Sequence, residues 1–441
     1  MFGRSRVSRN YGQVRPMTGN HHVELDPLHP SLASGSRLPA GATDSSYESF
    51  FLCSLQRHIT EGQIEFVTPR GRTVVGHGGQ RAIDSTPVVE VSNPDFFRRV
   101  LCAGNLGMAE SYMAGDFNVK DGRLPELLTL LLRNRLDKKL KQDKRFLARY
   151  LWIKTINRLS SNAENVRAHY DVGDELFDCF LSDKFQVYSC GYAQSWGDEI
   201  DDVQRNKLDR ICRKLELRPG QRLLDIGSGN GGLLIHAAQN YGVVATGVTN
   251  SRSHYKRSSS NIEKYHLQKQ LDVHLGDFTA IAGDFDRVVS VGMLEHVRPS
   301  RYSAYFKKIR SLLRPAGWGL VHCIGMNAAE NKNDPFIQKY IFPGSHTPKL
   351  SVIAANIESN DMAIIDVENI ARHYAVTTRR WLESFRRNHH RLTGTQYDGA
   401  FKRMWDYYLS CGVAVATAGE LAVYQVLFTN DYHTEYRFQR I

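Results

Sequence analysis

Residues 223–232 read LLDIGSGNGG, and this segment gives the first indication of the fold class. It places Gly227, Gly229 and Gly232 directly after an apolar run, in the spacing G-x-G-x-x-G. Glycines in such a loop let the backbone turn tightly and approach a ligand, and the helix that follows offers free N–H groups. From residue 166 onward, apolar strands alternate with helical runs. The alternation predicts an α/β fold with a doubly wound, mostly parallel, Rossmann-like sheet that binds ligands at the carboxyl ends of its strands.

The side chains around this loop distinguish between two kinds of cofactor. A dinucleotide site requires an acidic residue about 20 positions further on to bind the ribose, but this chain has Thr249, Asn250 and Ser251 there. Asp225 stands just before the first glycine, and Asp277 follows a later strand. S-adenosylmethionine has no pyrophosphate, so its site depends more on such side chains. The pattern therefore favours S-adenosylmethionine, and a glycine turn without a ligand is the alternative.

Composition limits the class of protein. A chain of 441 residues with 41% hydrophobic residues is long enough for two or three domains with sizeable cores. Its seven cysteines include no C-x-x-C pair, which argues against a zinc site and a disulfide framework and favours a reducing, intracellular setting. The sequence shows no apolar run of membrane-spanning length and no signal-peptide core, so we expect a cytoplasmic protein.

The basic charge is concentrated in one segment. A net charge of +11 indicates a polyanionic partner, nucleic acid or an anionic membrane surface, although a basic soluble protein is equally compatible. Residues 133–158 carry ten lysines and arginines against Asp137 and Asp143, with leucines at spacings of four or seven. This pattern is typical of an amphipathic helix at a membrane surface. A solvated linker helix is the alternative.

The chain divides into four parts by composition. Residues 1–45 are rich in Gly, Ser, Pro, Arg and His and are expected to be a disordered basic tail. Residues 46–132 combine short strands with helices over 96–115 and 124–134, which predicts a small α+β domain for packing, homodimer formation or substrate presentation. A basic helical linker is expected over 133–165, and the doubly wound domain over 166–441.

Eight motifs follow one another in order: HYDVGDELFDCFL, VYSCGYAQSW, LLDIGSGNGG, GVTNS, SVGMLEHV, LVHCIG, KYIFPGSHTP and FKRMWDYYLSCGVAVATAGELAVYQ. Together they resemble the cyclopropane-fatty-acyl-phospholipid synthase family, which also takes in mycolic-acid methyltransferases. The resemblance covers roughly residues 166–430. It implies the fold of a class I, S-adenosylmethionine-dependent methyltransferase.

The resemblance also implies a reaction. In the family, the cis double bond of an unsaturated phospholipid acyl chain attacks the methyl group of the sulfonium and leaves a carbocation. A bound bicarbonate ion is thought to remove a proton so that the cyclopropane ring closes. The site should be dry, because water would trap the cation, and aromatic, because ring faces stabilise positive charge.

The family's bicarbonate ligands carry over to matching positions of this chain. Cys190 is expected to offer its backbone N–H to the anion rather than to act as a nucleophile. Glu295 would either be protonated or accept the hydroxyl proton of bicarbonate. Cys411 lies where the family has sometimes been assigned a catalytic cysteine, but the mechanism needs no thiolate, so a core position is expected. The catalytic set is Cys190, Glu295, His322, Ile324 and Tyr374, with Cys411 as a further candidate.

The cofactor set carries over in the same way, with some departures. His254 replaces a more usual Gln, and Asp174, Arg298 and Ser345 also depart from the family pattern, which puts the product in doubt. An aromatic group, Tyr340, Phe342, Trp381 and Phe385, is expected to line the acyl chain, with ordinary core packing as the alternative. The cofactor-binding residues are Tyr188, Ser189, the run Leu223 to Gly231 with Asp225, Gly227 and Gly229, then Thr249, Asn250, Ser251, His254, Asp277 and Phe278.

Three other functions compete with ring closure. The same methyl transfer could end in a methyl-branched or methylene fatty acid. A non-catalytic lipid-binding protein is disfavoured because Glu295, Tyr374 and the glycine loop are present. A nucleic-acid methyltransferase would need a pocket for a flipped base and is outweighed by the resemblance. We therefore expect a cytoplasmic enzyme attached peripherally to the inner, anionic membrane surface, with no nucleic-acid partner and no metal.

Overall fold

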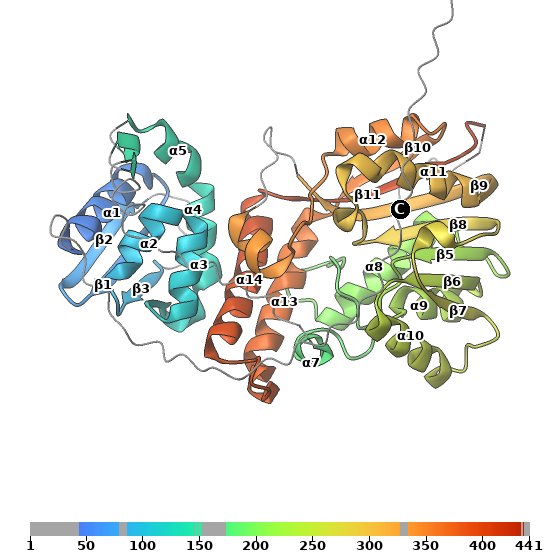
Figure 1. Ribbon diagram of the computed structural model, residues 1–441, viewed down its shortest axis with the longest axis horizontal. Helices are drawn as coiled ribbons and strands as arrows, with labels where there is room; N and C mark the ends of the chain where they lie inside the picture. Colours follow the sequence, from blue (N-terminus) through green and yellow to red (C-terminus); the bar gives the residue numbers. More distant parts are fainter. Residues whose placement is uncertain are drawn as a thin grey trace, which may run out of the picture. The chain divides into compact units, whose positions relative to one another are not determined.

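Figure 1 shows the computed structural model of the chain. It describes residues 44–78, 86–144, 146–148, 150–151, 173–326, 334–433 and 435. The predicted tail lies outside these residues except for its last two, where helix α1 begins. The HYDVG motif lies outside them apart from Gly173.

The sequence around the glycine loop forms a seven-stranded sheet. Strands β5 to β9 pair in parallel, and an antiparallel pair completes the edge, because β11 runs against β9 and β10 against β11. In the order β10-β11-β9-β8-β5-β6-β7, the strands are β10 (Ala363–Asn369), β11 (Ala422–Thr429), β9 (Leu313–Gly325), β8 (Phe285–Val291), β5 (Arg222–Ile226), β6 (Val244–Thr249) and β7 (Leu271–Leu275).

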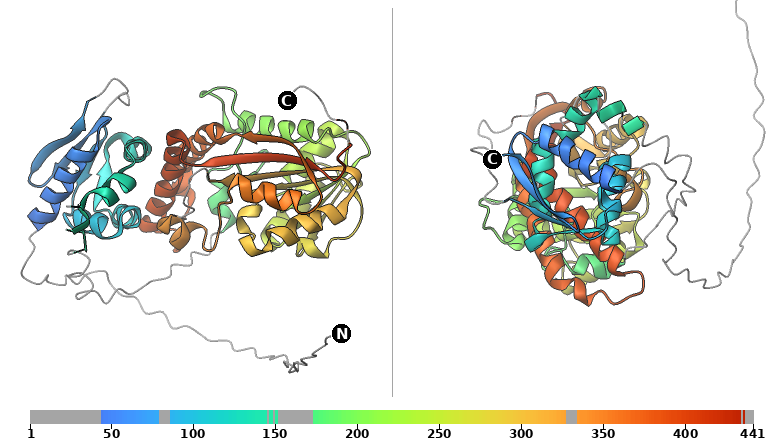
Figure 2. Two further views of the ribbon diagram at one scale, coloured as in Figure 1. Left: turned by 90° about the horizontal axis from the view of Figure 1, so that it is seen from above. Right: turned by 90° about the vertical axis from the view of Figure 1, so that its left-hand side faces the viewer.

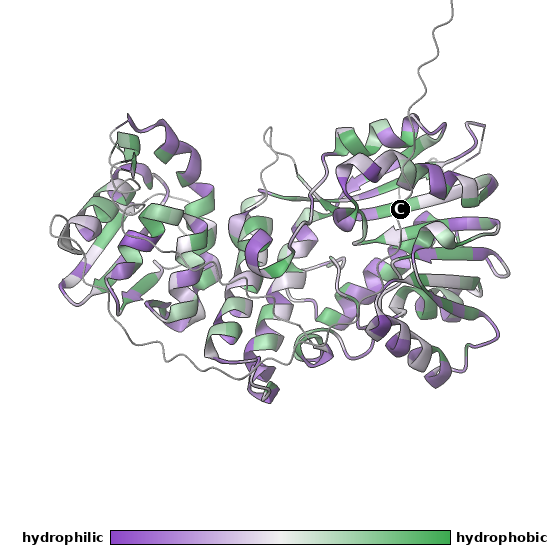
Figure 3. Ribbon diagram, viewed as in Figure 1, coloured by the Kyte–Doolittle hydropathy of each residue, from purple (hydrophilic) through white to green (hydrophobic). Residues whose placement is uncertain are grey.

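Helices cover both faces of this sheet, as Figure 2 shows, and this confirms the predicted doubly wound α/β class. One apolar cluster packs α11 and α12 on the sheet, and a second packs α8 and α9 on it. In Figure 3 the central strands are largely hydrophobic, whereas α10 is largely hydrophilic. The helices are α7 (Asp174–Asp178), α8 (Ile200–Lys214), α9 (Gly232–Tyr241), α10 (Arg252–Lys264), α11 (Tyr302–Leu312), α12 (Leu350–Glu358), α13 (Ala371–Asn388) and α14 (Gly399–Ala418).

The amino-terminal domain is α+β, as predicted. The helix expected over residues 96–115 is divided in two at Gly104, whose φ of 56° and ψ of −130° are not helical. The elements are α1 (Asp44–His58), β1 (Gly62–Thr68), β2 (Gly71–His77), β3 (Val88–Val91), α2 (Asp95–Ala103), α3 (Asn105–Ala114), β4 (Phe117–Val119) and α4 (Leu124–Arg133), with the strand order β2-β1-β3-β4.

The basic segment begins with a break. Arg135 has a left-handed φ of 49°, and helix α5 (Leu136–Gln142) starts directly after it. The Asn134 side chain accepts hydrogen bonds from the backbone N–H groups of Thr60 (2.8 Å) and Glu61 (3.0 Å), which fixes this break on the amino-terminal domain. Helical residues follow at 144, 146–148 and 150–151, and residues 152–165 of the predicted linker lie outside the described part of the chain.

Helix α14 joins the amino-terminal domain to the methyltransferase sheet, because α3 and α4 both contact it. The guanidinium group of Arg403 lies 3.9 Å from the ring centroid of Tyr112 and donates to the carbonyl of Phe117 at 2.8 Å. The Tyr112 hydroxyl donates in turn to Asp406 (3.1 Å). Over the described ranges, no helix has both the length and the apolar character needed to cross a bilayer.

Candidate active site

The glycine loop follows β5 and leaves an open space before α9. Gly227, Gly229 and Gly231 all have left-handed φ values, of 84°, 54° and 83°. A Cβ at Gly231 would lie 2.4 Å from Ser258 Oγ, whereas a Cβ at Gly229 would meet no atom within 4 Å. The loop therefore needs glycine for its backbone, and at Gly229 it borders free space that a ligand can fill.

Asp225 lies beside this loop and is 3% exposed. Its Oδ1 atom is buried and has no hydrogen-bond partner among the described residues. Burial raises the pKa of the carboxyl group to about 7, and the nearby Lys207 ammonium opposes this rise. A buried, unpaired carboxylate oxygen is costly and is suited to accept a hydrogen bond from a ligand. Asp225 and the open glycine cradle thus fit S-adenosylmethionine.

Strand β6 lies next to β5 and brings a second loop to the same edge of the sheet. Leu223 lies within β5 and is fully buried, so its side chain belongs to the core. Thr249 accepts a hydrogen bond from the Ser251 N–H (3.2 Å), and Ser251 Oγ accepts one from the His254 N–H (3.3 Å) at the start of α10. Asn250 is exposed.

Asp277 and Phe278 follow β7, the next strand along. The Asp277 carboxylate accepts hydrogen bonds from the backbone N–H (2.8 Å) and hydroxyl (2.6 Å) of Thr279, and these hold its pKa below the usual range. The ring of Phe278 packs edge-on against Tyr305, with the centroids 5.5 Å apart. The structure thus places both residues at the cofactor edge, with the Asp277 carboxylate engaged in its own turn.

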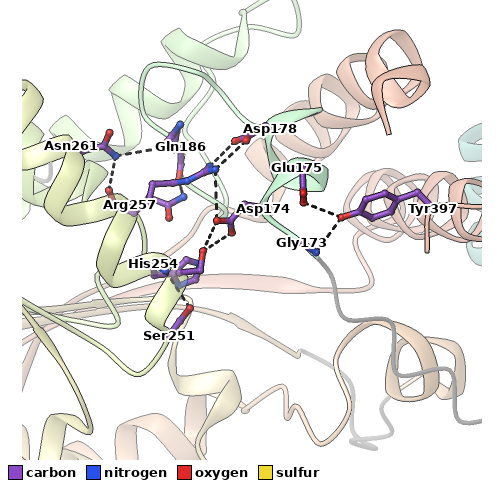
Figure 4. A network of polar contacts seen from close by, with 12 residues as sticks. Gly173, Asp174, Glu175, Asp178, Gln186, Ser251, His254, Arg257, Asn261 and Tyr397 are labelled. Carbon is purple, nitrogen blue, oxygen red and sulfur yellow. Dashed lines mark hydrogen bonds and ion pairs between the residues drawn. The ribbon is translucent and has the colours of Figure 1, made fainter. Parts of the chain in front are cut away.

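A polar network ties α7 to α10, as Figure 4 shows. Ser253 Oγ donates to the two oxygens of Asp174 at 2.6 and 2.5 Å, and Arg257 forms an ion pair with Asp178 at 2.6 Å. Asp174 is one of the residues that depart from the family pattern. A carboxylate at this position can bind a serine hydroxyl and also attract Arg257, which lies 3.8 Å away. The network fixes α10, whose first turn contains His254.

The loop from Tyr188 to Cys190 is held by its polar atoms. Tyr188 shares a 2.6 Å hydrogen bond between hydroxyl groups with Tyr408, and Ser189 Oγ accepts from Lys207 Nζ at 3.1 Å. Cys190 is 2% exposed, and burial raises the pKa of its thiol. The thiol is therefore protonated at neutral pH and suits packing rather than nucleophilic attack.

Glu295 lies in the turn η3 (Leu294–His296) that follows β8. Its Oε1 atom accepts a 2.6 Å hydrogen bond from the backbone N–H of Ile324. Its Oε2 atom is buried with no partner within the described part of the chain, and burial raises the pKa of the carboxyl group to about 7. Glu295 can therefore be neutral or charged near neutral pH, with one oxygen available to a further group.

His322 lies on β9, two residues before Ile324, so the two side chains face the same side of the sheet. Burial lowers the pKa of His322 to about 3, which keeps the ring neutral. Its Nδ1 atom lies 3.3 Å from the Nε2 amide of Gln425, which stands opposite on β11. With Gln425 as the donor, the ring proton is on Nε2, and this nitrogen can donate to an anion.

Tyr374, on α13, completes the predicted set. It is buried, and Tyr408, Cys190 and Glu295 add to the effect of burial in raising its pKa. The structure thus brings Cys190, Glu295 and Tyr374 together, and the hydrogen bond from the Ile324 N–H adds Ile324. His322 lies two residues from Ile324 on β9, and its side-chain contact is with Gln425. Cys411, on α14, does not act directly on these residues: it interacts with Tyr407 and Tyr408 of the same helix and with Asp334, which precedes η5 (Ile337–Ile341).

Half of the predicted acyl-chain lining borders this group. Trp381 lies near Tyr188 (ring centroids 5.2 Å apart) and Tyr374 (6.2 Å), and Phe342 lies near Tyr408 (5.9 Å). The other two members have different surroundings. The Tyr340 hydroxyl donates to Glu110 of the amino-terminal domain at 3.0 Å, and Phe385 is fully buried beside His389, with the ring centroids 5.6 Å apart.

Sequence reasoning missed the side chains that support the site, namely Gln204, Lys207, Tyr408 and Gln425. Only for Lys207 did the sequence contain a pattern that could have indicated its position. It follows Val203 by four positions and precedes Ile211 by four, so helical periodicity places its charge on a buried apolar face. The other three are ordinary helix and strand residues whose contacts arise only from tertiary pairing.

The chain is similar to several known proteins. The family model described as mycolic acid cyclopropane synthetase matches residues 157–426. Cyclopropane-fatty-acyl-phospholipid synthase from Escherichia coli (strain K12) is 36% identical over 354 residues, which are 80% of this chain and 90% of that protein. Tuberculostearic acid methyltransferase UfaA1 from Mycobacterium tuberculosis is 30% identical over 420 residues, 90% of this chain and 94% of that protein.

Two solved structures share the fold of the methyltransferase domain. The cyclopropane synthase MmaA2 from Mycobacterium tuberculosis has a TM-score of 0.56 at 26% identity and covers 61% of this chain and 98% of its own. The mycolic acid cyclopropane synthase CmaA1, complexed with SAH and CTAB, has a TM-score of 0.55 at 27% identity and covers 60% of this chain and 97% of its own. On these matches, the chain belongs to the mycolic acid cyclopropane synthetase family and is an S-adenosylmethionine-dependent methyltransferase.

Proposed function

We propose that this protein transfers a methylene group from S-adenosylmethionine to the cis double bond of unsaturated acyl chains in membrane phospholipids and closes a cyclopropane ring. The observation that carries the proposal is the buried Glu295 carboxyl group, with Oε1 on the Ile324 N–H and Oε2 without a partner in the described residues. The name of the Escherichia coli relative supports the same substrate class.

The cofactor would lie along the loops at the carboxyl ends of β5 and β6. S-adenosylmethionine supplies the methyl carbon as an electrophilic sulfonium. The free space at Gly229 gives the cofactor room to approach the backbone, and Asp225 Oδ1 can accept a hydrogen bond from it. Tyr188 and Ser189 would border the cofactor, because the residues just before them, Phe185 and Val187, lie against Gly232 of the glycine loop.

Deprotonation would occur at the set around Glu295. The residues present fit a bicarbonate ion, which would supply the base. The neutral His322 can donate from Nε2, and Glu295 can share a proton with the ion because its pKa lies near 7. The Tyr374 hydroxyl offers a further polar contact. Two bare anions would repel, so the raised pKa of Glu295 is what makes the arrangement possible.

The aromatic surroundings suit a cationic intermediate. Tyr188, Trp381 and Tyr374 form a connected group of rings next to Cys190. Ring faces stabilise a positive charge on the acyl chain, and their bulk excludes water that would trap it. Phe342 extends this apolar wall through its edge-on contact with Tyr408.

Attachment to the membrane surface would use the basic segment. Helix α5 carries Lys138, Lys139 and Lys141, and Leu147 and Leu151 are 41% and 53% exposed. Cations beside exposed leucines suit an anionic bilayer surface, here the inner face of the cytoplasmic membrane. Binding to anionic liposomes should fall steeply with added salt, and salt-insensitive binding would contradict this attachment.

A second outcome of the same chemistry has its own support. A methyltransferase named for tuberculostearic acid matches 90% of this chain, and Asp174, Arg298 and Ser345 depart from the synthase pattern. The test incubates the protein with unsaturated liposomes, S-adenosylmethionine and bicarbonate. A mass gain of one CH₂ with cyclopropane proton signals in NMR supports ring closure, a gain with branched-chain signals supports the second outcome, and no gain overturns both.

A further inference from the structure

Lys207 is a buried lysine without a carboxylate partner. It lies on α8 and its exposed fraction is 0%. Its ammonium group donates to Ser189 Oγ at 3.1 Å and forms no ion pair with a described residue. Burial lowers its pKa to about 7. An unpaired ammonium group is costly to bury, so a lysine at this position calls for an explanation.

A second buried lysine on the same helix, in contrast, forms ion pairs with carboxylates. Lys214 is 4% exposed, and its Nζ atom lies 2.7 Å from a Glu368 oxygen and 3.2 Å from an Asp366 oxygen. Lys214 thus links α8 to the edge strand β10, and among the site residues its charge acts on His322 but not on Asp225 or Ser189. Both lysines lie on α8 and are buried, but the charged groups around them differ.

The surroundings of Lys207 belong to the cofactor loops. Besides Ser189, its charge acts on Asp225 and on the thiols of Cys190 and Cys212. It also acts on the imidazoles of His322 and His236. One turn earlier on α8, the Gln204 amide donates to the Ser189 carbonyl at 3.0 Å. Two side chains of α8 therefore hold Ser189, and one of them carries a charge that also reaches the end of β5.

We propose that Lys207 is a positioning residue for S-adenosylmethionine. It holds the Tyr188–Cys190 loop through Ser189, and its positive charge stabilises the Asp225 carboxylate that would accept a hydrogen bond from the bound cofactor. The proposal rests on the proposed function, because it needs S-adenosylmethionine in this site. Lys207 acts through Ser189 and Asp225, since its ammonium group is enclosed by protein.

The charge balance explains why a neutral donor would not suffice. The Asp225 carboxyl group is buried, and Lys207 is the cation that acts on it, so a positive charge at position 207 stabilises the ionised carboxylate in a low-dielectric site. A hydroxyl or amide in place of the ammonium group could bind Ser189 Oγ but would leave the Asp225 carboxylate without this charge. Cofactor affinity should therefore depend on the charge at position 207 and not only on the hydrogen bond.

The test measures S-adenosylhomocysteine affinity of the full chain by titration calorimetry. Lys207→Met should weaken binding at least about tenfold, as for other lost charge-assisted contacts, and should raise KM for S-adenosylmethionine more than it lowers kcat. Lys214→Met is the matched control, because it removes an equally buried lysine from the same helix. It should lower the melting temperature but leave the affinity unchanged. Equal affinity of Lys207→Met and wild type would overturn the proposal.

Two further variants separate charge from hydrogen bonding and remain informative if Lys207→Met does not fold. Lys207→Gln keeps a neutral donor, and Lys207→Arg keeps the charge. Retained affinity in the arginine variant and weakened affinity in the glutamine variant support the charge role, whereas equal affinity in both overturns it. A wild-type protein that does not bind S-adenosylhomocysteine would instead contradict the proposed function.

Discussion

The backbone N–H of Ile324 on β9 donates a 2.6 Å hydrogen bond to Oε1 of Glu295, which lies in the turn after the neighbouring strand β8. The contact fixes the carboxyl group and leaves its second oxygen buried without a partner in the described residues. The two strands are parallel, so their carboxyl ends place both residues at one edge of the sheet. The carboxyl group is thus fixed through Oε1, and Oε2 can bind a ligand.

Glu295→Gln should abolish most of the catalysis and spare cofactor binding. The amide keeps the size and an acceptor for the Ile324 N–H, but it cannot share a proton with an anion. We expect kcat to fall about 10²-fold or more, as for the loss of other proton-transfer or anion-stabilising groups. Product analysis by mass spectrometry and calorimetry with S-adenosylhomocysteine test the two parts. Full activity of the variant would remove Glu295 from the mechanism.

The same substitution should change how stability depends on pH. The pKa of Glu295 rises from 4.5 to about 7 on folding, so between these values the folded state binds more protons than the unfolded state. The stabilisation is complete below pH 4.5 and is lost as the pH rises through 7. Relative to Glu295→Gln, the wild-type free energy of unfolding should fall by about 3 kcal/mol across this window. Urea denaturation of both proteins provides the measurement, and parallel pH profiles would contradict the raised pKa.

A methyl group at Gly229 should block the cofactor without disrupting the fold. Its φ is 54° and a Cβ would meet no atom within 4 Å, so Gly229→Ala should cost roughly 1–2 kcal/mol in backbone strain. Gly220→Ala, at φ 79° and also in open space, is the control for that strain. Only Gly229→Ala should weaken S-adenosylhomocysteine binding. If both variants bind equally well, the cofactor does not approach this glycine.

The contacts of Glu110 with the π-helical turn beside Phe342 should affect the efficiency with which the enzyme uses its lipid substrate. Glu110 accepts from Lys339 (2.9 Å) and Tyr340 (3.0 Å), both in the π-helical turn η5 (Ile337–Ile341) next to Phe342. Glu110→Ala should lower kcat/KM for phospholipid about threefold, in line with a partly exposed ion pair, and leave KM for S-adenosylmethionine unchanged.

Glu126→Ala is the control for Glu110→Ala. Glu126 pairs with Arg379 on α13 at 3.2 Å, so it also links the amino-terminal domain to the methyltransferase domain but does not touch η5. Equal losses of kcat/KM for phospholipid in the two variants would show that the contact between the domains matters and that the position of η5 does not.

Cys411 should be dispensable. Burial raises the pKa of its thiol, with Asp334 adding to the rise, so it is protonated at neutral pH and is a weak nucleophile. Cys411→Ala should change kcat by less than about twofold, because a buried cysteine acts mainly as a small apolar residue. A loss comparable to that of Glu295→Gln would restore the catalytic assignment.

The glycine loop and the strands around it could be predicted because their signals are local. LLDIGSGNGG specifies a strand, a turn with positive φ and a helix within ten residues. The antiparallel edge was not specified, since Asn369 of β10 pairs with Tyr424 of β11, which lies 55 positions further along the chain. The break at Gly104 was missed because a glycine inside an amphipathic helix usually costs stability without ending it.

The placement of supporting side chains depends on tertiary pairing. Gln425 reaches His322 only through the β11–β9 register, and Lys207 reaches Ser189 only once α8 packs on the sheet. Family resemblance supplied the proposed catalytic and cofactor-binding residues, and it said nothing about the residues that hold them in place. The periodicity of α8, with Lys207 on its buried face, was the one available clue.

Helix α14 determines how well the methyltransferase domain can be produced without the amino-terminal domain. One side of it packs on α13, and the other carries Arg403, Asp406 and Tyr407, which bind Tyr112, Phe117 and Asn105 of the amino-terminal domain. A truncated protein starting at α7 would expose the Tyr407 ring to water and lose its contact with Asn105, whereas Asp406 would lose Tyr112 but keep its 2.6 Å ion pair with Arg386 of α13. Expression of the catalytic half alone should therefore give aggregating material, and a usable minimal enzyme would need polar replacements along that side of the helix.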